Sequence, residues 1–268
     1  MDFTFSKEHE LLRRMVREFA QKEVAPIAAE IDLEERVPFE VIKKAAQVGL
    51  MGVPFPQKYR GAGAGEIGYC ILMEELNKVC ASTATIIGAH TGIGAMAIYL
   101  DGTEEQKQKY LVPLARGEKI AAFALTEANA GSDAAAIQTR AVREGDHFIL
   151  NGSKIWITNG DIADVLTVFA VTDPALGARG GVTAFIVEKT FPGFRVGTKE
   201  TKMGIRGSST AEIIFEDCRV PAENVLGQFG AGFLTALKTL DVGRISLGAG
   251  CLGGAQVALD MSMDFAKN

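Results

Sequence analysis

The spacing of the apolar residues changes twice along this chain of 268 residues, and these changes most constrain its fold. Near the N-terminus Leu12, Met15 and Phe19 recur at helical spacing. From Lys119 short β-rich runs alternate with turn residues, and from Gly232 the helical spacing returns. The sequence therefore predicts an all-helical domain at 1–118, a middle β domain at 119–227 and the start of a C-terminal helical domain at 228–268.

The middle region has seven expected strands: 120–125, 138–143, 147–150, 154–158, 165–171, 182–187 and 211–215. Because no helical segments separate these runs, we expect an antiparallel barrel or sandwich. Asn151-Gly152 lies between two of them and is typical of a two-residue type I′ hairpin.

The helical regions contain local signals for the ends of helices. Pro26 is expected to end or kink the first helix, and Thr103 with Gln106 forms a capping box. Residues 81–100 carry no carboxylate, Lys or Arg and are long enough to span a bilayer. Their Ser, Thr, His and Gly residues instead favour a helix buried inside a helical domain, so we expect no membrane span.

Charge and cysteine usage exclude several kinds of site. The formal net charge of −5 and the absence of long basic runs argue against general nucleic-acid binding. The four Cys and three His residues are scattered, so no metal site is expected. The first residues lack the pattern of a signal or transit peptide, and a cytoplasmic location follows as the default.

One short motif points to a nucleotide site but lacks the context for it. Gly63-Ala-Gly-Glu-Ile-Gly68 matches the dinucleotide fingerprint, which needs a buried strand before it and an acid about twenty residues later. Pro54 and Pro56 precede this motif, and residues 86–91 contain no acid. We therefore do not expect a nicotinamide site here.

A second stretch, Phe123-Ala-Leu-Thr-Glu-Ala-Asn-Ala-Gly-Ser-Asp133, begins as an apolar strand and ends in a polar turn. Hydroxyls and bare backbone N–H groups in such a turn can hold a phosphate. Taken alone, an ordinary turn that binds nothing explains the same residues, because Gly, Ser and Asp all favour turns.

Several motifs in one order resemble the acyl-CoA dehydrogenase family over the whole chain, and its bacterial short-chain (butyryl-CoA) branch in particular. Besides Leu125-Thr-Glu-Ala-Asn-Ala-Gly-Ser-Asp133, they include Asn151-Gly-Ser-Lys-Ile-Trp-Ile-Thr-Asn-Gly160, Lys202-Met-Gly-Ile-Arg-Gly-Ser-Ser209 and Leu240-Asp-Val-Gly-Arg244. The resemblance implies FAD-dependent oxidation of a short-chain acyl-CoA to a trans-2-enoyl-CoA. It also implies a homotetramer that passes electrons to an electron-transferring flavoprotein.

The resemblance also assigns roles to positions that match the family's motifs. Phe123, Leu125 and Thr126 are expected to line the isoalloxazine ring, with Thr126 bonding its pyrimidine end. The FAD pyrophosphate is expected to meet Gly131 and Ser132, and the thioester substrate also meets Ser132. The second wall of the flavin site is expected to consist of Trp156, Ile157 and Thr158. The CoA contacts are expected from Asp241 and Arg244.

Each position also has an ordinary structural explanation. Trp156 could be a core residue, Thr158 a strand residue chosen for its β propensity, and Arg244 a helix residue in a salt bridge. The sequence departs from the family at Ala128, where relatives have Pro, and at Arg60, where they have Gly.

The most consequential departure concerns the catalytic base. One family position for the base matches Gly243, which cannot remove a proton, and the family's late C-terminal segment is not in this sequence. Glu127 is structural in the family, so we expect no catalytic residue in these 268 residues and little or no turnover. The alternatives are an acyl-CoA oxidase that uses oxygen and a non-catalytic module that binds FAD or CoA.

Overall fold

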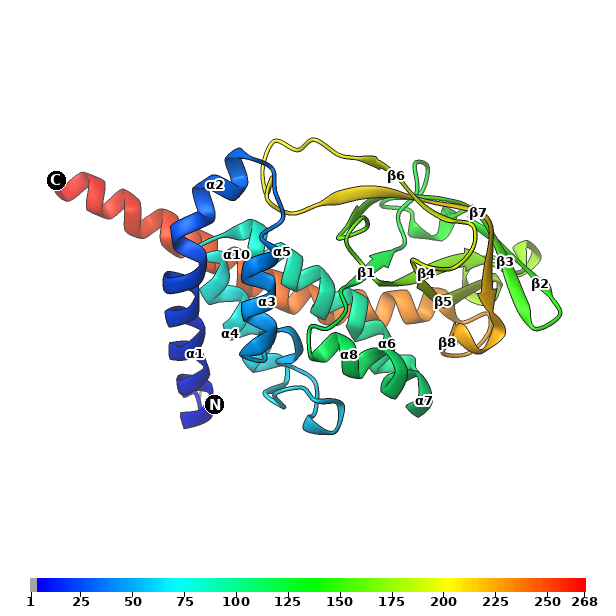
Figure 1. Cartoon of the computed structure of the whole chain (residues 1–268), viewed down its shortest axis with the longest axis horizontal. Helices are drawn as coiled ribbons and strands as arrows, with labels where there is room; N and C mark the ends of the chain where they lie inside the picture. The colour runs from blue at the N-terminus through cyan, green and yellow to red at the C-terminus, as the bar shows by residue number, and fades with distance from the viewer. Residues whose placement is uncertain (1–3) are drawn as a thin grey trace.

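Residues 4–268 are described by the computed structural model, in which a group of helices lies beside one β-sheet (Figure 1). The long helix α10 (Gly232–Lys267) runs along both groups and projects beyond the helices at its C-terminal end. One apolar core joins the helices to the sheet and includes Phe123 and Phe169, whose ring centres are 4.9 Å apart.

The helices begin and end largely where the local signals predict. Thr103 forms the expected capping box with Gln106, and Pro26 lies in a short 3₁₀ turn between the first two α-helices. The helices before the sheet are α1 (Lys7–Phe19), α2 (Ala28–Leu33), α3 (Phe39–Gln47), α4 (Gly65–Asn77), α5 (Ala81–Gly88), α6 (Met96–Asp101), α7 (Glu104–Gln106) and α8 (Val112–Ala115).

The uncharged stretch forms one continuous helical segment, in which the π-helical η5 (Ala89–Ala95) joins α5 to α6. Among the described residues, Ala81–Asp101 alone is long and apolar enough to span a membrane, and 67% of its apolar window is buried inside the protein. Gly94 lies so close to the sheet that a Cβ there would be 2.7 Å from the Cβ of Ala121. The predicted buried helix is confirmed.

Eight strands form one mixed sheet, in the order β6-β7-β3-β2-β4-β5-β8, with β1 paired to β4. Most neighbouring strands are antiparallel, as expected, but β1 and β2 each run parallel to β4. The strands are β1 (Ala121–Ala124), β2 (Arg140–Glu144), β3 (His147–Thr158), β4 (Val165–Val171), β5 (Val182–Glu188), β6 (Phe194–Lys199), β7 (Thr210–Pro221) and β8 (Val225–Leu226); the short helix α9 (Ala178–Gly181) precedes β5.

The predicted hairpin at Asn151-Gly152 is wrong, because β3 runs through both residues as a single strand. Gly152 has a φ of 144° and lies at an irregularity in the pairing of β3 with β7. The glycine therefore belongs to a bulge in the strand and not to a turn. The hairpin lies earlier in the sequence, at Gly145-Asp146. These two residues connect β2 to β3, and Glu144 pairs with His147 across the hairpin. Gly145 has a φ of 61°, as a tight two-residue loop requires.

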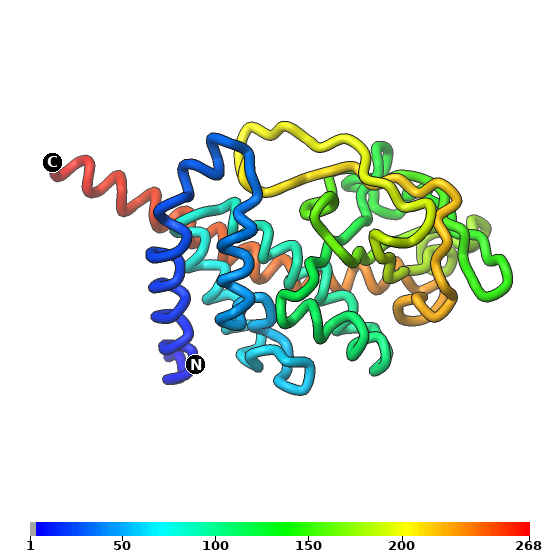
Figure 2. The backbone as a smooth tube through the Cα atoms, viewed as in Figure 1, coloured from blue at the N-terminus to red at the C-terminus, as the bar shows by residue number. Residues whose placement is uncertain are grey.

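The segment between β6 and β7 connects the sheet to the helices, and Figure 2 shows it beside α2. The backbone N–H of Arg206 donates to Oδ1 of Asp32 at 3.1 Å, and the N–H of Gly207 donates to Oγ of Ser82 at 3.2 Å. These bonds hold the segment against α2 and α5, so polar contacts join the sheet region to the helical region.

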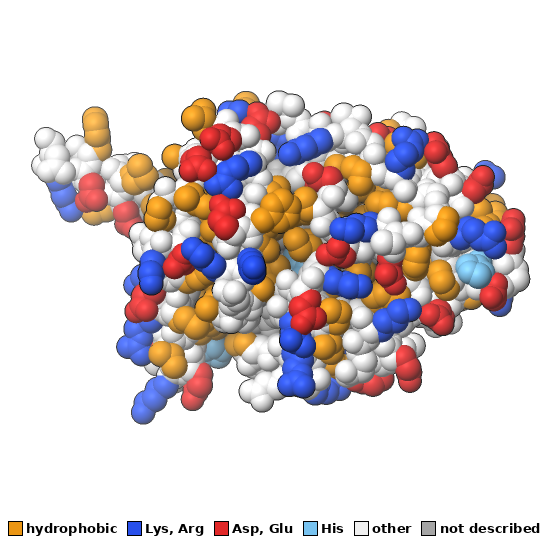
Figure 3. Space-filling view, in the orientation of Figure 1, with side chains coloured by type: hydrophobic (Ala, Val, Ile, Leu, Met, Phe, Trp, Pro, Cys, Tyr) orange, Lys and Arg blue, Asp and Glu red, His pale blue; other side chains and the backbone are white. Residues whose placement is uncertain are grey.

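Helix α10 packs on α4 through glycines. A Cβ at Gly253 would lie 2.2 Å from the carbonyl oxygen of Glu74, and one at Gly250 would lie 2.7 Å from the amide nitrogen of Asn77. The outer end of the same helix extends away from the body of the protein in Figure 3. It carries exposed apolar side chains, including Leu259, Met261, Met263 and Phe265.

Candidate functional site

The first wall of the candidate site begins at the end of β1. Phe123 and Leu125 are 8% and 7% exposed, so they belong to the core surface beneath the loop. Thr126 follows them and is partly exposed. The loop after β1 therefore starts from a rigid apolar base.

A tight turn then brings the small polar residues to the surface. Glu127 and Ala130 exchange two backbone hydrogen bonds, each 3.1 Å long. Gly131 and Ser132 follow this turn and are exposed. A Cβ added at Gly131 would meet nothing within 4 Å, and its φ is not positive. Neither packing nor backbone geometry therefore requires glycine at this position.

The second wall is the C-terminal part of β3. Trp156 is 62% exposed and has a φ of 57°, an uncommon conformation for a bulky residue. The pairing of β3 with β7 is interrupted between Lys154 and Ile157, and this interruption turns the indole out of the sheet. Ile157 is buried and Thr158 is half-buried beside it. Trp156 is thus not a core residue.

A backbone hydrogen bond joins the two walls. The N–H of Ile155 donates to the carbonyl oxygen of Thr126 at 2.9 Å. Thr126 therefore lies against the strand residue that directly precedes Trp156. The fold brings together the two motifs that the sequence assigned to one site, although their residues lie 24 (Ser132 to Trp156) to 35 (Phe123 to Thr158) positions apart along the chain.

Sequence reasoning missed an ion pair that lies under this junction. The side chain of Lys154 is 0% exposed, and its Nζ lies 2.7 Å from Oε1 of Glu127 and 3.2 Å from the carbonyl oxygen of Leu125. A lysine within a strand gives no signal of such burial, because most lysines in strands face solvent.

Burial and pairing change the pKa of both groups. Burial lowers the pKa of Lys154 to about 8, against the opposing effect of the Glu127 carboxylate. Burial acts to raise the pKa of Glu127, but the Lys154 ammonium and hydrogen bonds from Thr139 and Gln138 bring it below its usual value. Glu127 is therefore held as a bonded carboxylate and is not placed as a free base.

A buried histidine anchors the other end of β1. Nδ1 of His90 accepts the N–H of Ala121 at 2.9 Å, so Nε2 carries the proton and donates to the carbonyl oxygen of Leu114 at 3.1 Å. Burial lowers the pKa of His90 to about 4, and the imidazole is therefore neutral at pH 7.

Polar atoms without partners lie directly beyond Thr158. Among the described residues, Oδ1 of Asn159 and Oγ of Ser209 are buried and accept or donate no hydrogen bond. Their backbones are joined, since the N–H of Asn159 donates to the carbonyl oxygen of Ser209 at 2.9 Å. Buried polar atoms are normally paired, so these two leave capacity for a polar ligand or water.

The two residues expected to contact CoA lie on α10. Asp241 and Arg244 form an exposed ion pair of 2.8 Å. No hydrogen bond or ion pair between described residues links them to the loop after β1. Between them, Gly243 faces η5, and a Cβ there would lie 2.9 Å from Cγ2 of Ile93.

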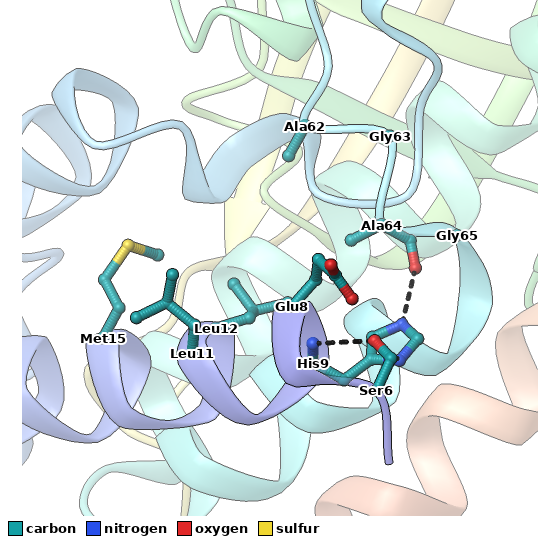
Figure 4. A pocket seen from close by; sticks show the side chains of 10 residues that line it. All are labelled: Ser6, Glu8, His9, Leu11, Leu12, Met15, Ala62, Gly63, Ala64 and Gly65. Carbon is teal, nitrogen blue, oxygen red and sulfur yellow. Dashed lines mark hydrogen bonds between the residues drawn. The ribbon is translucent and has the colours of Figure 1, made fainter.

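One groove borders the helices, and another borders the loop. One, of about 610 Å³, separates the start of α1 from residues 62–65, and in Figure 4 His9 bonds the carbonyl oxygen of Ala64 at its edge. Leu11 and Met15 line it with apolar surface. The second, of about 490 Å³, borders the loop after Ser132 and includes Arg140. Within residues 4–268, no cluster of three or more His, Cys, Asp or Glu side chains could hold a metal ion.

Comparison with known families gives two matches along the chain. Residues 6–118 match the acyl-CoA dehydrogenase N-terminal domain, and residues 122–218 match the acyl-CoA dehydrogenase middle domain. The short-chain-specific acyl-CoA dehydrogenase of Clostridium acetobutylicum is 55% identical over 267 residues, which cover 100% of this chain and 70% of that protein.

Solved structures have the same arrangement of elements. A structure described under the electron transferring flavoprotein of Acidaminococcus fermentans has a TM-score of 0.97 and 48% identity, covering 100% of this chain and 70% of its own. An acyl-CoA dehydrogenase from Bacillus anthracis, complexed with FAD, has a TM-score of 0.91 and 40% identity, covering 98% and 45%.

Proposed function

Because this chain belongs to the acyl-CoA dehydrogenase family, we propose that it binds FAD between its two walls and serves α,β-dehydrogenation of a short-chain acyl-CoA. The observation that carries the proposal is the hydrogen bond from Ile155 to Thr126, which brings the exposed Trp156 and the small polar loop to one place. The short-chain preference rests on the 55% identical relative, which is named for it.

The residues present fit a flavin dinucleotide. Trp156 offers an exposed aromatic face, and the hydroxyls of Thr126 and Thr158 stand on the two walls beside it. The bare backbone around Gly131 suits a close approach by pyrophosphate oxygens, since no neighbour occupies that space. Partnerless buried oxygens of Asn159 and Ser209 add polar capacity beyond Thr158.

When bound, FAD would accept the hydride that leaves the β-carbon of the thioester. The protein's own part is to orient and to exclude water. Phe123, Leu125 and Ile157 form the apolar base. Trp156 would cover the flavin ring, and Ser132 would bond the pyrophosphate and the thioester. Asp241 and Arg244 are proposed to contact CoA from α10, where their exposure leaves them accessible.

The α-proton is proposed to be taken by a carboxylate outside these 268 residues. Gly243 has no side chain to remove it, and Glu127 is already bonded to Lys154, Gln138 and Thr139. The relative from C. acetobutylicum is longer, because this chain covers 70% of it. We propose that this uncovered part supplies the base and the contacts of a homotetramer, and that an electron-transferring flavoprotein takes the electrons.

One purified sample tests the proposal. Addition of FAD, followed by gel filtration, is expected to leave a yellow protein with the visible absorption bands of bound flavin. Butyryl-CoA is expected to shift these bands without bleaching them under anaerobic conditions, because the proposed base lies outside these 268 residues.

Other outcomes would replace the proposal. Protein that elutes without flavin indicates a non-catalytic module. Rapid bleaching by butyryl-CoA contradicts the missing base, and peroxide formation in air indicates an oxidase.

A further inference from the structure

The buried ammonium of Lys154 is unusual because fully buried lysines are rare and are nearly always paired. Its Nζ makes two contacts, with Oε1 of Glu127 at 2.7 Å and with the carbonyl oxygen of Leu125 at 3.2 Å. Lys154 belongs to β3, whereas Glu127 and Leu125 belong to the loop after β1. One side chain therefore links the two walls beneath their surface.

The Glu127 carboxylate extends this link to the far end of the same loop. Oε1 accepts the N–H of Thr139 at 3.0 Å, and Oε2 accepts the N–H of Gln138 at 2.6 Å. The same residue closes the tight turn with Ala130 through its backbone. The segment that carries Gly131 and Ser132 is thus fixed at both ends by one residue.

We propose that Lys154 and Glu127 are a positioning pair that sets the loop of Gly131 and Ser132 against the Trp156 wall, an inference that rests on the FAD site proposed above. The pair acts through the backbone of the loop. Without it, the Ile155 to Thr126 hydrogen bond and the backbone bonds between Glu127 and Ala130 remain. The far end of the loop, however, loses the side-chain anchor that holds Gln138 and Thr139.

Charge balance gives the pair a second effect on the loop. The Glu127 carboxylate would otherwise repel an anion held at Gly131 and Ser132, and Lys154 compensates it at 2.7 Å. The bond from Lys154 to the carbonyl oxygen of Leu125 also polarises the Leu125–Thr126 peptide, so the N–H of Thr126 becomes a stronger donor.

If Lys154 and Glu127 served only the stability of the fold, another buried ion pair would have the same effect when disrupted. The chain offers such a pair as a matched control. Glu75 is also a buried carboxylate, 2% exposed, and it bonds Arg17 at 3.0 Å and Lys78 at 3.0 Å between α1 and α4. That cluster lies in the helical region. Its disruption should destabilise the protein without changing the loop after β1.

The test compares Lys154→Met, the double variant Lys154→Met with Glu127→Gln, and the control Arg17→Met. Two readouts are used: the FAD dissociation constant from flavin fluorescence, and amide hydrogen exchange of residues 130–138 in protein free of FAD. The double variant avoids an unpaired buried charge and is therefore expected to stay folded for both measurements.

We expect the double variant to exchange the loop amides at least about tenfold faster and to bind FAD at least about tenfold more weakly. Arg17→Met is expected to lower Tm and leave both readouts unchanged. Wild-type exchange of the loop in the folded double variant would overturn the positioning role, as would wild-type FAD affinity. If the unchanged protein binds no FAD, the proposed function fails instead, while the exchange data still report on the pair.

Discussion

The loop after β1 and the outer half of α10 are both rich in small and apolar residues, yet they are held very differently. The loop is fixed by a buried ion pair, by two hydrogen bonds to Glu127 and by the bond between Ile155 and Thr126. The outer half of α10 exposes its apolar side chains, among them Phe265 at 89%. A segment can thus have regular secondary structure and few tertiary contacts, or the reverse. Here the irregular loop after β1 has more tertiary contacts than the regular outer half of α10.

The largest expected effect comes from removing the charge that balances Glu127. Lys154→Met leaves a carboxylate unpaired in the interior, and we expect the free energy of unfolding to fall by about 3–5 kcal/mol. Urea denaturation followed by circular dichroism measures this loss. Lys189→Met is the control, because its pair with Asp164 has the same 2.7 Å separation but is exposed to solvent.

The control variant is expected to lose at most about 1 kcal/mol. Equal losses for the two variants would contradict the view that burial separates these ion pairs.

The next effect concerns acid. The folded-state pKa of His90 is about 4, below the ordinary 6.5, so the unfolded chain binds the additional proton between these values. The contribution of His90 is therefore fully present above pH 6.5 and is lost as the pH falls toward 4, by about 3 kcal/mol in total. His90→Asn keeps an acceptor near the position of Nδ1 but does not titrate.

Denaturation curves across this range are expected to show a shallower pH dependence for His90→Asn than for the unchanged protein. Parallel curves would show that His90 does not link folding to pH.

A smaller effect, of opposite sign at the two positions, is expected from two Gly-to-Ala changes, one in η5 and one in α10. At Gly94 the new Cβ would lie 2.7 Å from the Cβ of Ala121, and the resulting strain should cost about 1–3 kcal/mol. At Gly248, in α10, nothing lies within 4 Å, so alanine should stabilise the helix by up to about 1 kcal/mol. Thermal unfolding of both variants checks the signs, and a stabilising Gly94→Ala would show that η5 is not tightly packed on β1.

The smallest effect is expected at the end of α10. Phe265→Gln removes an exposed apolar ring that contributes little to the core, so the free energy of unfolding should change by at most about 0.5 kcal/mol. Chemical denaturation measures it. A loss above 2 kcal/mol would mean that the ring is packed in solution.

The sequence predicts the periodic parts of the molecule well, because each depends on neighbouring residues. The capping box at Thr103, the break near Pro26 and the buried helix predicted at 81–100 are confirmed, and so are the family and its helix–sheet–helix order. The hairpin at Asn151-Gly152 is wrong because a glycine in an irregular strand and one in a turn look alike locally.

The interior of the site could not be predicted in the same way. Lys154 lies between Ser153 and Ile155, in a local sequence that is ordinary for a strand. Its burial depends on Glu127, which lies 27 positions away in the sequence. The backbone strain at Trp156 likewise arises from irregular pairing with β7. Motif resemblance assigned site residues on both walls, and the ligand contacts of those residues stay predictions.

The central claim, that FAD binds between the Thr126 loop and Trp156, can be tested by fluorescence, because Trp156 is the only tryptophan in the chain. Titration with FAD is expected to quench the Trp156 emission to a plateau at one FAD per chain, and Thr158→Val should weaken the binding. Emission that falls only in proportion to absorption by free FAD, with no plateau, would contradict the account.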